Sequence, residues 1–185
     1  MGRYFSSDNY LKGNFGKEIV RSLLERAGYT VSLYGYEVTM LDAMSKYTYK
    51  KWNSVTGRRL TSSPDLLVYD EKDVMVLVEV KTRGKSPPRI RSVEIERYKN
   101  YWSDAILVVV VPEGLYAQRI NELDIRKDGK YPLSDFKQFQ EIFVRVDSVD
   151  VEHYESIVLE MLKIFMSERD KVALEKIPQM PQYSL

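Results

Sequence analysis

An acidic and a basic side chain stand together at the end of an otherwise apolar segment, Val74 to Lys81, which reads VMVLVEVK. Alternate side chains of a β-strand point to the same face, so Glu79 and Lys81 would lie side by side on one face of a sheet. Burial of a charge pair there costs desolvation free energy and requires a compensating interaction. The pair therefore indicates either a reaction centre or a structural ion pair.

A second carboxylate, Asp65, stands at the start of the strand predicted just before this segment. An antiparallel hairpin can place Asp65 opposite Glu79. The same register puts Tyr69 opposite Met75 and leaves residues 70–74 as the connection. The two carboxylates would then converge, and like charges at close range repel unless a cation lies between them. The spacing predicts a divalent metal site; the alternative is that Asp65 caps the start of its strand beside a structural ion pair.

The composition limits which metal such a site can hold. The 185 residues include no cysteine and a single histidine, His153, which excludes thiolate and multi-histidine sites. The ligands must be oxygen atoms, which favours Mg²⁺, Mn²⁺ or Ca²⁺. The longest apolar run, Ile106–Val111, is far shorter than the ~18 residues of a membrane span, and no signal peptide is visible. We expect a cytoplasmic protein without a membrane partner.

Basic residues are concentrated in two stretches, although the formal net charge is only +1. Residues 46–59 and 81–91 each contain five basic residues and no acid. Lysine and arginine on one surface can contact phosphates, and aromatic side chains between them can stack on bases. For residues 46–60, a solvated hairpin is the alternative. The candidate DNA-contacting residues are Arg83, Lys85, Arg89, Arg91, Lys46, Lys50, Lys51, Trp52, Arg58 and Arg59.

The elements that must position these residues follow an α/β order. Helical periodicity predicts a first helix from Ser7 or Asp8 to Ala27, closed by Gly28. The pattern predicts strands at 29–36, 66–69, 74–81, 106–111 and 143–146, a basic aromatic hairpin or loop at 46–60, and helices at 92–102 and 150–174. Since 106–111 is apolar throughout, it should be a central strand parallel to a neighbour.

These elements predict an α/β fold with a central mixed β-sheet flanked by helices and a long C-terminal helix. We expect one domain over residues 1–185, with a core at about 8–111, an extension at about 112–175 and a tail at 176–185. The apolar side of the last helix could cover the sheet or form a dimer interface.

The motif Pro64-Asp65 followed by Glu79-Val80-Lys81 resembles that of the PD-(D/E)XK nuclease superfamily. Many members carry a glutamate on an N-terminal helix, which Glu18 would match. The layout of this helix is similar to the archaeal Holliday-junction-resolvase branch, and the resemblance covers about residues 8–111. It implies a restriction-endonuclease-like α-β-β-β-α-β core. The chain departs from the pattern of some members in having no Gln at 89–102.

The resemblance also implies roles. Asp65 and Glu79, helped by the Val80 carbonyl, would bind Mg²⁺ or Mn²⁺, and Glu18 would complete the outer metal shell. Lys81 would activate the attacking water or stabilise charge on the phosphate. The implied activity is that of a metal-dependent DNA endonuclease, acting as a homodimer on branched or structured DNA and leaving a 5′-phosphate. The alternative is a non-catalytic DNA-binding or assembly module on the same fold.

Overall fold

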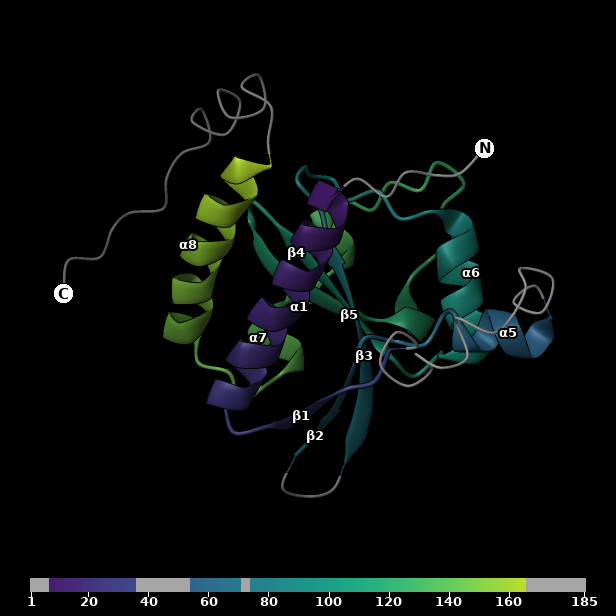
Figure 1. Ribbon diagram of the computed structural model, residues 1–185, viewed down its shortest axis with the longest axis horizontal. Coiled ribbons are helices and arrows are strands. Elements are labelled where there is room, and N and C mark those ends of the chain that lie inside the picture. Colours follow the sequence, from purple (N-terminus) through teal and green to yellow (C-terminus); the bar gives the residue numbers. More distant parts are fainter. Residues whose placement is uncertain (1–6, 36–53, 71–73, 166–185) are drawn as a thin grey trace.

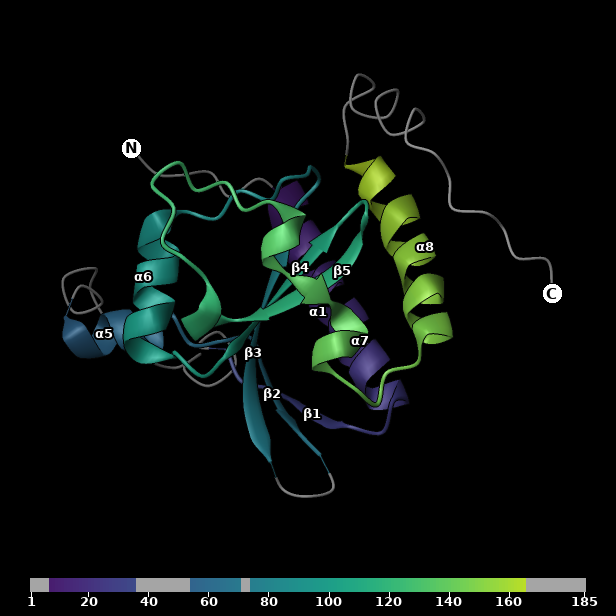
Figure 2. The ribbon, with the colours of Figure 1, turned by 180° about the vertical axis from the view of Figure 1, so that it is seen from behind.

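The computed structural model describes residues 7–35, 54–70 and 74–165. Within them, a six-stranded mixed sheet lies between two layers of helices (Figures 1 and 2). Strands β3 and β4 are parallel, and the other neighbouring strands are antiparallel. The strands, in their order across the sheet, are β1 (Thr30–Leu33), β2 (Leu66–Tyr69), β3 (Met75–Thr82), β4 (Ile106–Val111), β5 (Gly114–Arg119) and β6 (Lys137–Gln138). The predicted fold class is confirmed, and the predicted division into core, extension and tail stays a prediction.

The two helical layers bury opposite faces of the sheet. On one face lie α1 (Ser7–Arg26), α7 (Phe139–Ile142) and α8 (Ser148–Ile164), with α1 beside α8 (Figure 1). On the other lie α6 (Ser92–Tyr101) and the 3₁₀ turns η1 (Ile120–Glu122) and η2 (Leu133–Asp135). The short α5 (Val55–Leu60) lies near α6 (Figures 1 and 2). None of the helices in the described ranges is long and apolar enough to cross a bilayer.

Strand β4 occupies the centre because all six of its side chains are apolar and buried. Its even-numbered residues, Ile106, Val108 and Val110, belong to the core under α1 and α8. Its odd-numbered residues, from Leu107 onward, belong to the core under α6. Two buried faces are what a continuous apolar strand requires, so the predicted central strand with a parallel neighbour is confirmed.

The β2–β3 register agrees with the prediction. Tyr69 lies opposite Met75, and Leu66 lies opposite Val78. Asp65 immediately precedes Leu66, so the same register continues to place it opposite Glu79. A slip of one residue would have turned one of the two carboxylates to the other face of the sheet.

Two predicted elements are wrong in the part of the chain that the structure describes. Residues 55–60 form helix α5 rather than part of a hairpin or loop, because the Ser54 hydroxyl accepts a hydrogen bond from the Gly57 N–H at 3.0 Å and caps a helical turn. Residues 46–53 lie outside the described residues. The predicted strand at 143–146 is a turn in which the Val146 N–H donates to the Phe143 carbonyl. The Phe143 and Val146 side chains are apolar because this turn packs into the core.

The remaining boundaries differ modestly from prediction. Helix α1 ends at Arg26, and Gly28 follows with a φ of +81°, a left-handed conformation typical of a glycine at a helix end. Strand β5 was not predicted, since residues 112–140 carry a weak pattern. Helix α8 starts at Ser148, and the stretch beyond residue 165 lies outside the described residues. Its buried side covers the sheet, as the first of the two interpretations expected.

Helix α1 approaches β3 closely at Gly16. A Cβ atom there would lie 1.8 Å from Thr82 Oγ1 and 3.1 Å from Thr82 Cβ, whereas a Cβ at Gly13 would meet nothing within 4 Å. We therefore expect Gly16→Ala to lower the free energy of unfolding by about 1–3 kcal/mol. Gly13→Ala, the matched control, should raise it by roughly 0.5–1 kcal/mol because alanine favours the helix. Urea unfolding of both variants tests this; equal effects would contradict the close packing.

Candidate active site

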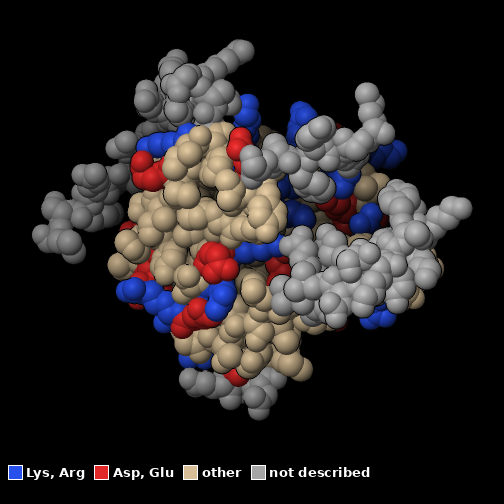
Figure 3. Space-filling model, in the orientation of Figure 1, with Lys and Arg blue, Asp and Glu red and all other residues tan. Residues whose placement is uncertain are grey.

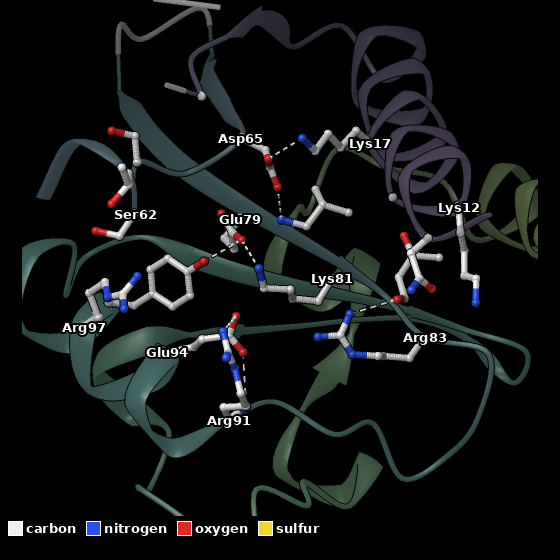
Figure 4. A pocket seen from close by; sticks show the side chains of 18 of the residues that line it. Lys12, Lys17, Ser62, Asp65, Glu79, Lys81, Arg83, Arg91, Glu94 and Arg97 are labelled. Atoms are coloured by element: carbon white, nitrogen blue, oxygen red, sulfur yellow. Dashed lines mark hydrogen bonds and ion pairs between the residues drawn. The ribbon is translucent and has the colours of Figure 1, made fainter. Parts of the chain in front are cut away.

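A cavity of about 800 Å³ lies at the end of β3 between α1 and α6 (Figure 4). Its walls come from α1, the segment before β2, the end of β3 and one side of α6. Of the described residues that line it, six are basic (Lys12, Lys17, Lys81, Arg83, Arg91 and Arg97) and three are acidic (Asp65, Glu79 and Glu94). The cavity thus combines carboxylates with an excess of positive charge.

Asp65 is fixed by one contact to each carboxylate oxygen. Its Oδ2 accepts a hydrogen bond from the Val80 N–H at 2.9 Å, so the side chain bonds to the backbone of β3. Its Oδ1 lies 2.8 Å from the Lys17 ammonium on α1 (Figure 4). The side chain is 12% exposed. Asp65 therefore faces the cavity, oriented by a strand on one side and a helix on the other.

Glu79 is more deeply buried, with 5% of its side chain exposed. Its Oε1 accepts a hydrogen bond from the Tyr98 hydroxyl at 2.6 Å and pairs with the Lys81 ammonium at 2.5 Å (Figure 4). Burial raises the pKa of Glu79 to about 7, and the charge of Asp65 adds to this effect. Lys81 and Tyr98 act in the opposite direction but do not outweigh the burial. Ionised Glu79 is thus costly, and additional positive charge nearby would stabilise it.

Lys81 lies on the same side of β3 as Glu79, as the strand alternation predicted. Burial alone would lower its pKa, but the pairing with Glu79 outweighs burial and the pKa is raised. The side chain is therefore held as an ammonium near neutral pH. The Nζ atom also lies 5.6 Å from the centre of the Tyr98 ring, within the range of a cation–π contact.

The donor atoms fit a hard divalent cation. Asp65 and Glu79 offer carboxylate oxygens to the same cavity, and Val80 between Glu79 and Lys81 also lines it. Within the described residues, no group of three or more histidine, aspartate or glutamate side chains is placed to hold a metal ion. Two carboxylates suit Mg²⁺ or Mn²⁺, since such ions keep several water ligands and share phosphate oxygens of the substrate.

Helix α6 contributes two residues that the sequence analysis did not select. Tyr98 bonds to Glu79, and Glu94 lines the cavity from the same side of the helix. Burial alone would raise the pKa of Glu94, but hydrogen bonding to Arg91 and the charge of Lys81 lower it. The available signal was the four-residue spacing of Glu94 and Tyr98 on the helix after the Lys81 strand, which places both on one helical face.

Glu18, predicted for the outer metal shell, is not brought to this cavity. Its side chain is 59% exposed and pairs with Arg21 on the outer side of α1. The preceding residue, Lys17, faces Asp65 instead. Successive side chains of an α-helix point about 100° apart, so Lys17 faces the cavity while the next residue, Glu18, faces solvent.

The predicted DNA-contacting residues are distributed over several places. Arg91 lines the main cavity, and Arg83 lines both this cavity and a second one of about 600 Å³. Arg58 and Arg59 are exposed on α5, where Arg59 lies 5.3 Å from the Trp102 ring centre. The second cavity is also lined by Lys85, Arg89 and Lys130. Lys46, Lys50, Lys51 and Trp52 lie outside the described residues.

The surface view agrees with this distribution of charge. Figure 3 shows a hollow in which acidic atoms lie deep and basic side chains surround them. Arg83, which lines both cavities, is fixed in place because its guanidinium donates to the carbonyls of Arg89 at 2.8 Å and Thr82 at 3.0 Å. An acidic floor with a basic rim suits a cation bound together with a polyanion.

Comparison with known proteins finds a distant structural similarity. No family model matches the sequence, and no curated protein matches it. Among solved structures, the chain is similar to Hjc of Archaeoglobus fulgidus, a Holliday junction resolvase from an archaeal hyperthermophile. The identity is 15% and the TM-score 0.48, over 71% of this chain and 94% of that chain. These values describe a partial likeness of fold, so the function proposed below is inferred from the site itself.

Removal of the Tyr98 hydroxyl should destabilise the metal-free protein. Tyr98→Phe takes a hydrogen bond from a buried carboxylate, which costs roughly 1.5–3 kcal/mol. Because that bond stabilises ionised Glu79, the loss should grow as the pH rises through about 7 and shrink below it. Urea unfolding in EDTA between acidic and alkaline pH measures both effects. Tyr116→Phe, whose hydroxyl donates to the neutral Glu113 carbonyl, is the control with a pH-independent loss of about 1 kcal/mol or less. Equal losses at every pH in the two variants would contradict this role of Tyr98.

Proposed function

We propose that this protein is a Mg²⁺- or Mn²⁺-dependent DNA endonuclease that hydrolyses phosphodiester bonds. One observation carries the proposal: Asp65, just before β2, continues the β2–β3 register opposite Glu79, and both line one cavity together with Lys81. The basic excess around them supports a polyanionic substrate.

In this proposal, some residues of the site hold the metal ion and others contact the phosphate. Asp65 and Glu79 would hold the ion, with the Val80 carbonyl as a further ligand. A bound Mg²⁺ or Mn²⁺ supplies a water of lowered pKa and neutralises charge on the phosphate. In the hydrolysis, the water oxygen bonds to phosphorus, the bond to the 3′ oxygen breaks, and a proton passes to that leaving oxygen. The product then carries a 5′-phosphate.

Lys81 and α6 would act on the reacting phosphate and on Glu79. Lys81 is held as an ammonium, so it would stabilise negative charge that develops on the phosphate rather than accept a proton. Tyr98 keeps the Glu79 carboxylate in one orientation. Arg83 and Arg91 lie on the walls of the same cavity and would contact neighbouring phosphates. Glu18 is left out of the proposed site, because it pairs with Arg21 away from the cavity.

A purely structural ion pair is a weaker account of the same residues. A structural pair is stabilised when it is sealed and fully paired, whereas these carboxylates line an open cavity beside several further cations. Burial also raises the pKa of Glu79, which makes its charge a cost to folding. Strongly shifted pKa values of this kind cluster at functional sites.

The two carboxylates can be tested directly. Asp65→Asn and Glu79→Gln should each lower Mn²⁺-dependent DNA cleavage by at least about 100-fold and weaken Mn²⁺ binding in calorimetry, because each removes a charged ligand. Glu96→Gln, on the exposed side of α6, is the control and should cut like wild type. Wild-type cleavage by either site variant would refute the assignment.

Branched or structured DNA and a homodimer are the finer parts of the proposal. Two cuts related by two-fold symmetry would suit a four-way junction, which motivates both parts together. We expect a four-way junction to be cut faster than duplex, flap or single-stranded DNA of the same sequence. Sedimentation of the protein should show a dimer. A protein that binds these DNAs without binding Mn²⁺ or cutting them would instead be a non-catalytic DNA-binding module.

A further inference from the structure

Lys17 competes with any cation for one particular oxygen of Asp65. Asp65 Oδ2 is committed to the Val80 N–H within the sheet. The other oxygen, Oδ1, is paired with a long side chain instead of the backbone, because it lies 2.8 Å from the Lys17 ammonium. A divalent ion at Oδ1 and an ammonium beside the same atom would repel each other strongly. A metal ion at Asp65 is therefore bound more favourably once Lys17 has moved away.

A displaced Lys17 would lie in a cavity that already holds several cations. Lys12, Lys81 and Arg83 line the same space, and a bound metal ion would add two more positive charges. The Lys17 side chain is 26% exposed and has a long flexible stem, so its ammonium can swing toward the open part of the cavity. The group that best compensates it there is an anion, and the anion that a nucleic acid brings is a phosphate.

We propose that Lys17 is a phosphate-binding residue. It pairs with Asp65 while no metal ion is bound and contacts a DNA phosphate once a metal ion occupies the site. Metal and DNA binding are then coupled: the metal ion releases Lys17 to the DNA, and the DNA phosphate stabilises the released Lys17. Such coupling is reciprocal, so each ligand raises the affinity for the other by the same factor. This inference rests on the proposed function, because it takes Asp65 as a metal ligand and DNA as the substrate.

Lys17 and Lys81 both pair with a carboxylate of the site, but they come from different elements. Lys81 and its partner Glu79 lie on one strand, and the Lys81 side chain is 18% exposed. Lys17 comes from α1, which packs on β3 through Gly16 and needs no ion pair to reach it. A merely structural role for Lys17, as a tether between α1 and β2, predicts that its loss weakens every property of the site. The competitive role predicts that the loss of Lys17 strengthens metal binding at Asp65.

Metal affinity in the absence of DNA separates the two roles. Titration calorimetry with Mn²⁺ should show Lys17→Met binding about tenfold more tightly than wild type, because Asp65 loses its competitor. Lys17→Arg keeps a cation opposite Asp65 and should bind like wild type. Lys12→Met is the matched control: Lys12 lines the same cavity from the same helix but lies over the Phe165 ring, and its removal should leave Mn²⁺ affinity nearly unchanged. Unchanged or weaker Mn²⁺ binding by Lys17→Met would overturn the proposal.

DNA affinity in EDTA gives a second readout that needs no metal and no cleavage. Asp65→Asn keeps an acceptor for the Val80 N–H but removes the charge that pairs with Lys17, so this variant should bind a fluorescent DNA roughly fivefold or more tightly than wild type in anisotropy measurements. Removal of one negative charge also favours DNA by itself, so the gain is compared in a double-mutant cycle. In the Lys17→Met background the gain should largely disappear, and in the Lys12→Met background it should persist.

The outcomes distinguish this inference from the proposed function. If wild type binds no Mn²⁺ and cuts no DNA, the proposed function fails, whatever the cycle in EDTA shows. If wild type binds Mn²⁺ and cuts DNA, but the Asp65→Asn gain is equal with and without Lys17, Lys17 is a structural tether and the inference fails alone.

Discussion

The buried Glu79 on β3 and the partly buried Asp65 just before β2 lie at opposite positions of one hairpin, and much of the surrounding structure holds them there. Asp65 is bonded to the Val80 N–H and to Lys17, and Glu79 to Tyr98 and Lys81. Each contact places an N–H, an O–H or an ammonium against a carboxylate oxygen in a region of low dielectric constant. The arrangement keeps an acidic pair folded in a form that remains open to a cation from the cavity.

The strand arrangement explains why Glu79 meets α6. Strands β3 and β4 are parallel, so the chain must cross from the end of one to the start of the other, and α6 lies within this crossover. A crossover helix packs on the face of the sheet that it spans. Glu79 points to that face, and Tyr98 therefore comes within hydrogen-bonding distance. The ends of parallel strands are also where α/β proteins commonly bind ligands, which agrees with the cavity at the end of β3.

The position of α1 sets the other half of the site. Gly16 lets the helix approach Thr82 more closely than any side chain would allow, and this approach carries Lys17 to Asp65. The same helix turns Glu18 outward to Arg21. The charge beside Asp65 is therefore positive rather than negative. In this respect the site differs from the pattern that the family resemblance suggested, and in our proposal the charges of α1 would influence metal binding at Asp65.

Local rules were sufficient for the strand residues of the site. The alternation of side chains in VMVLVEVK placed Glu79 beside Lys81, and the length of the hairpin placed Asp65 opposite Glu79. The absence of cysteine and the single histidine restricted any metal ligands to oxygen. These properties depend on composition and on neighbours within one hairpin, so the sequence by itself determined them. Which side of α1 and α6 meets the hairpin was decided by the tertiary structure. A helix rotates by about 100° per residue, and its orientation against the sheet depends on distant contacts such as that of Gly16 with Thr82.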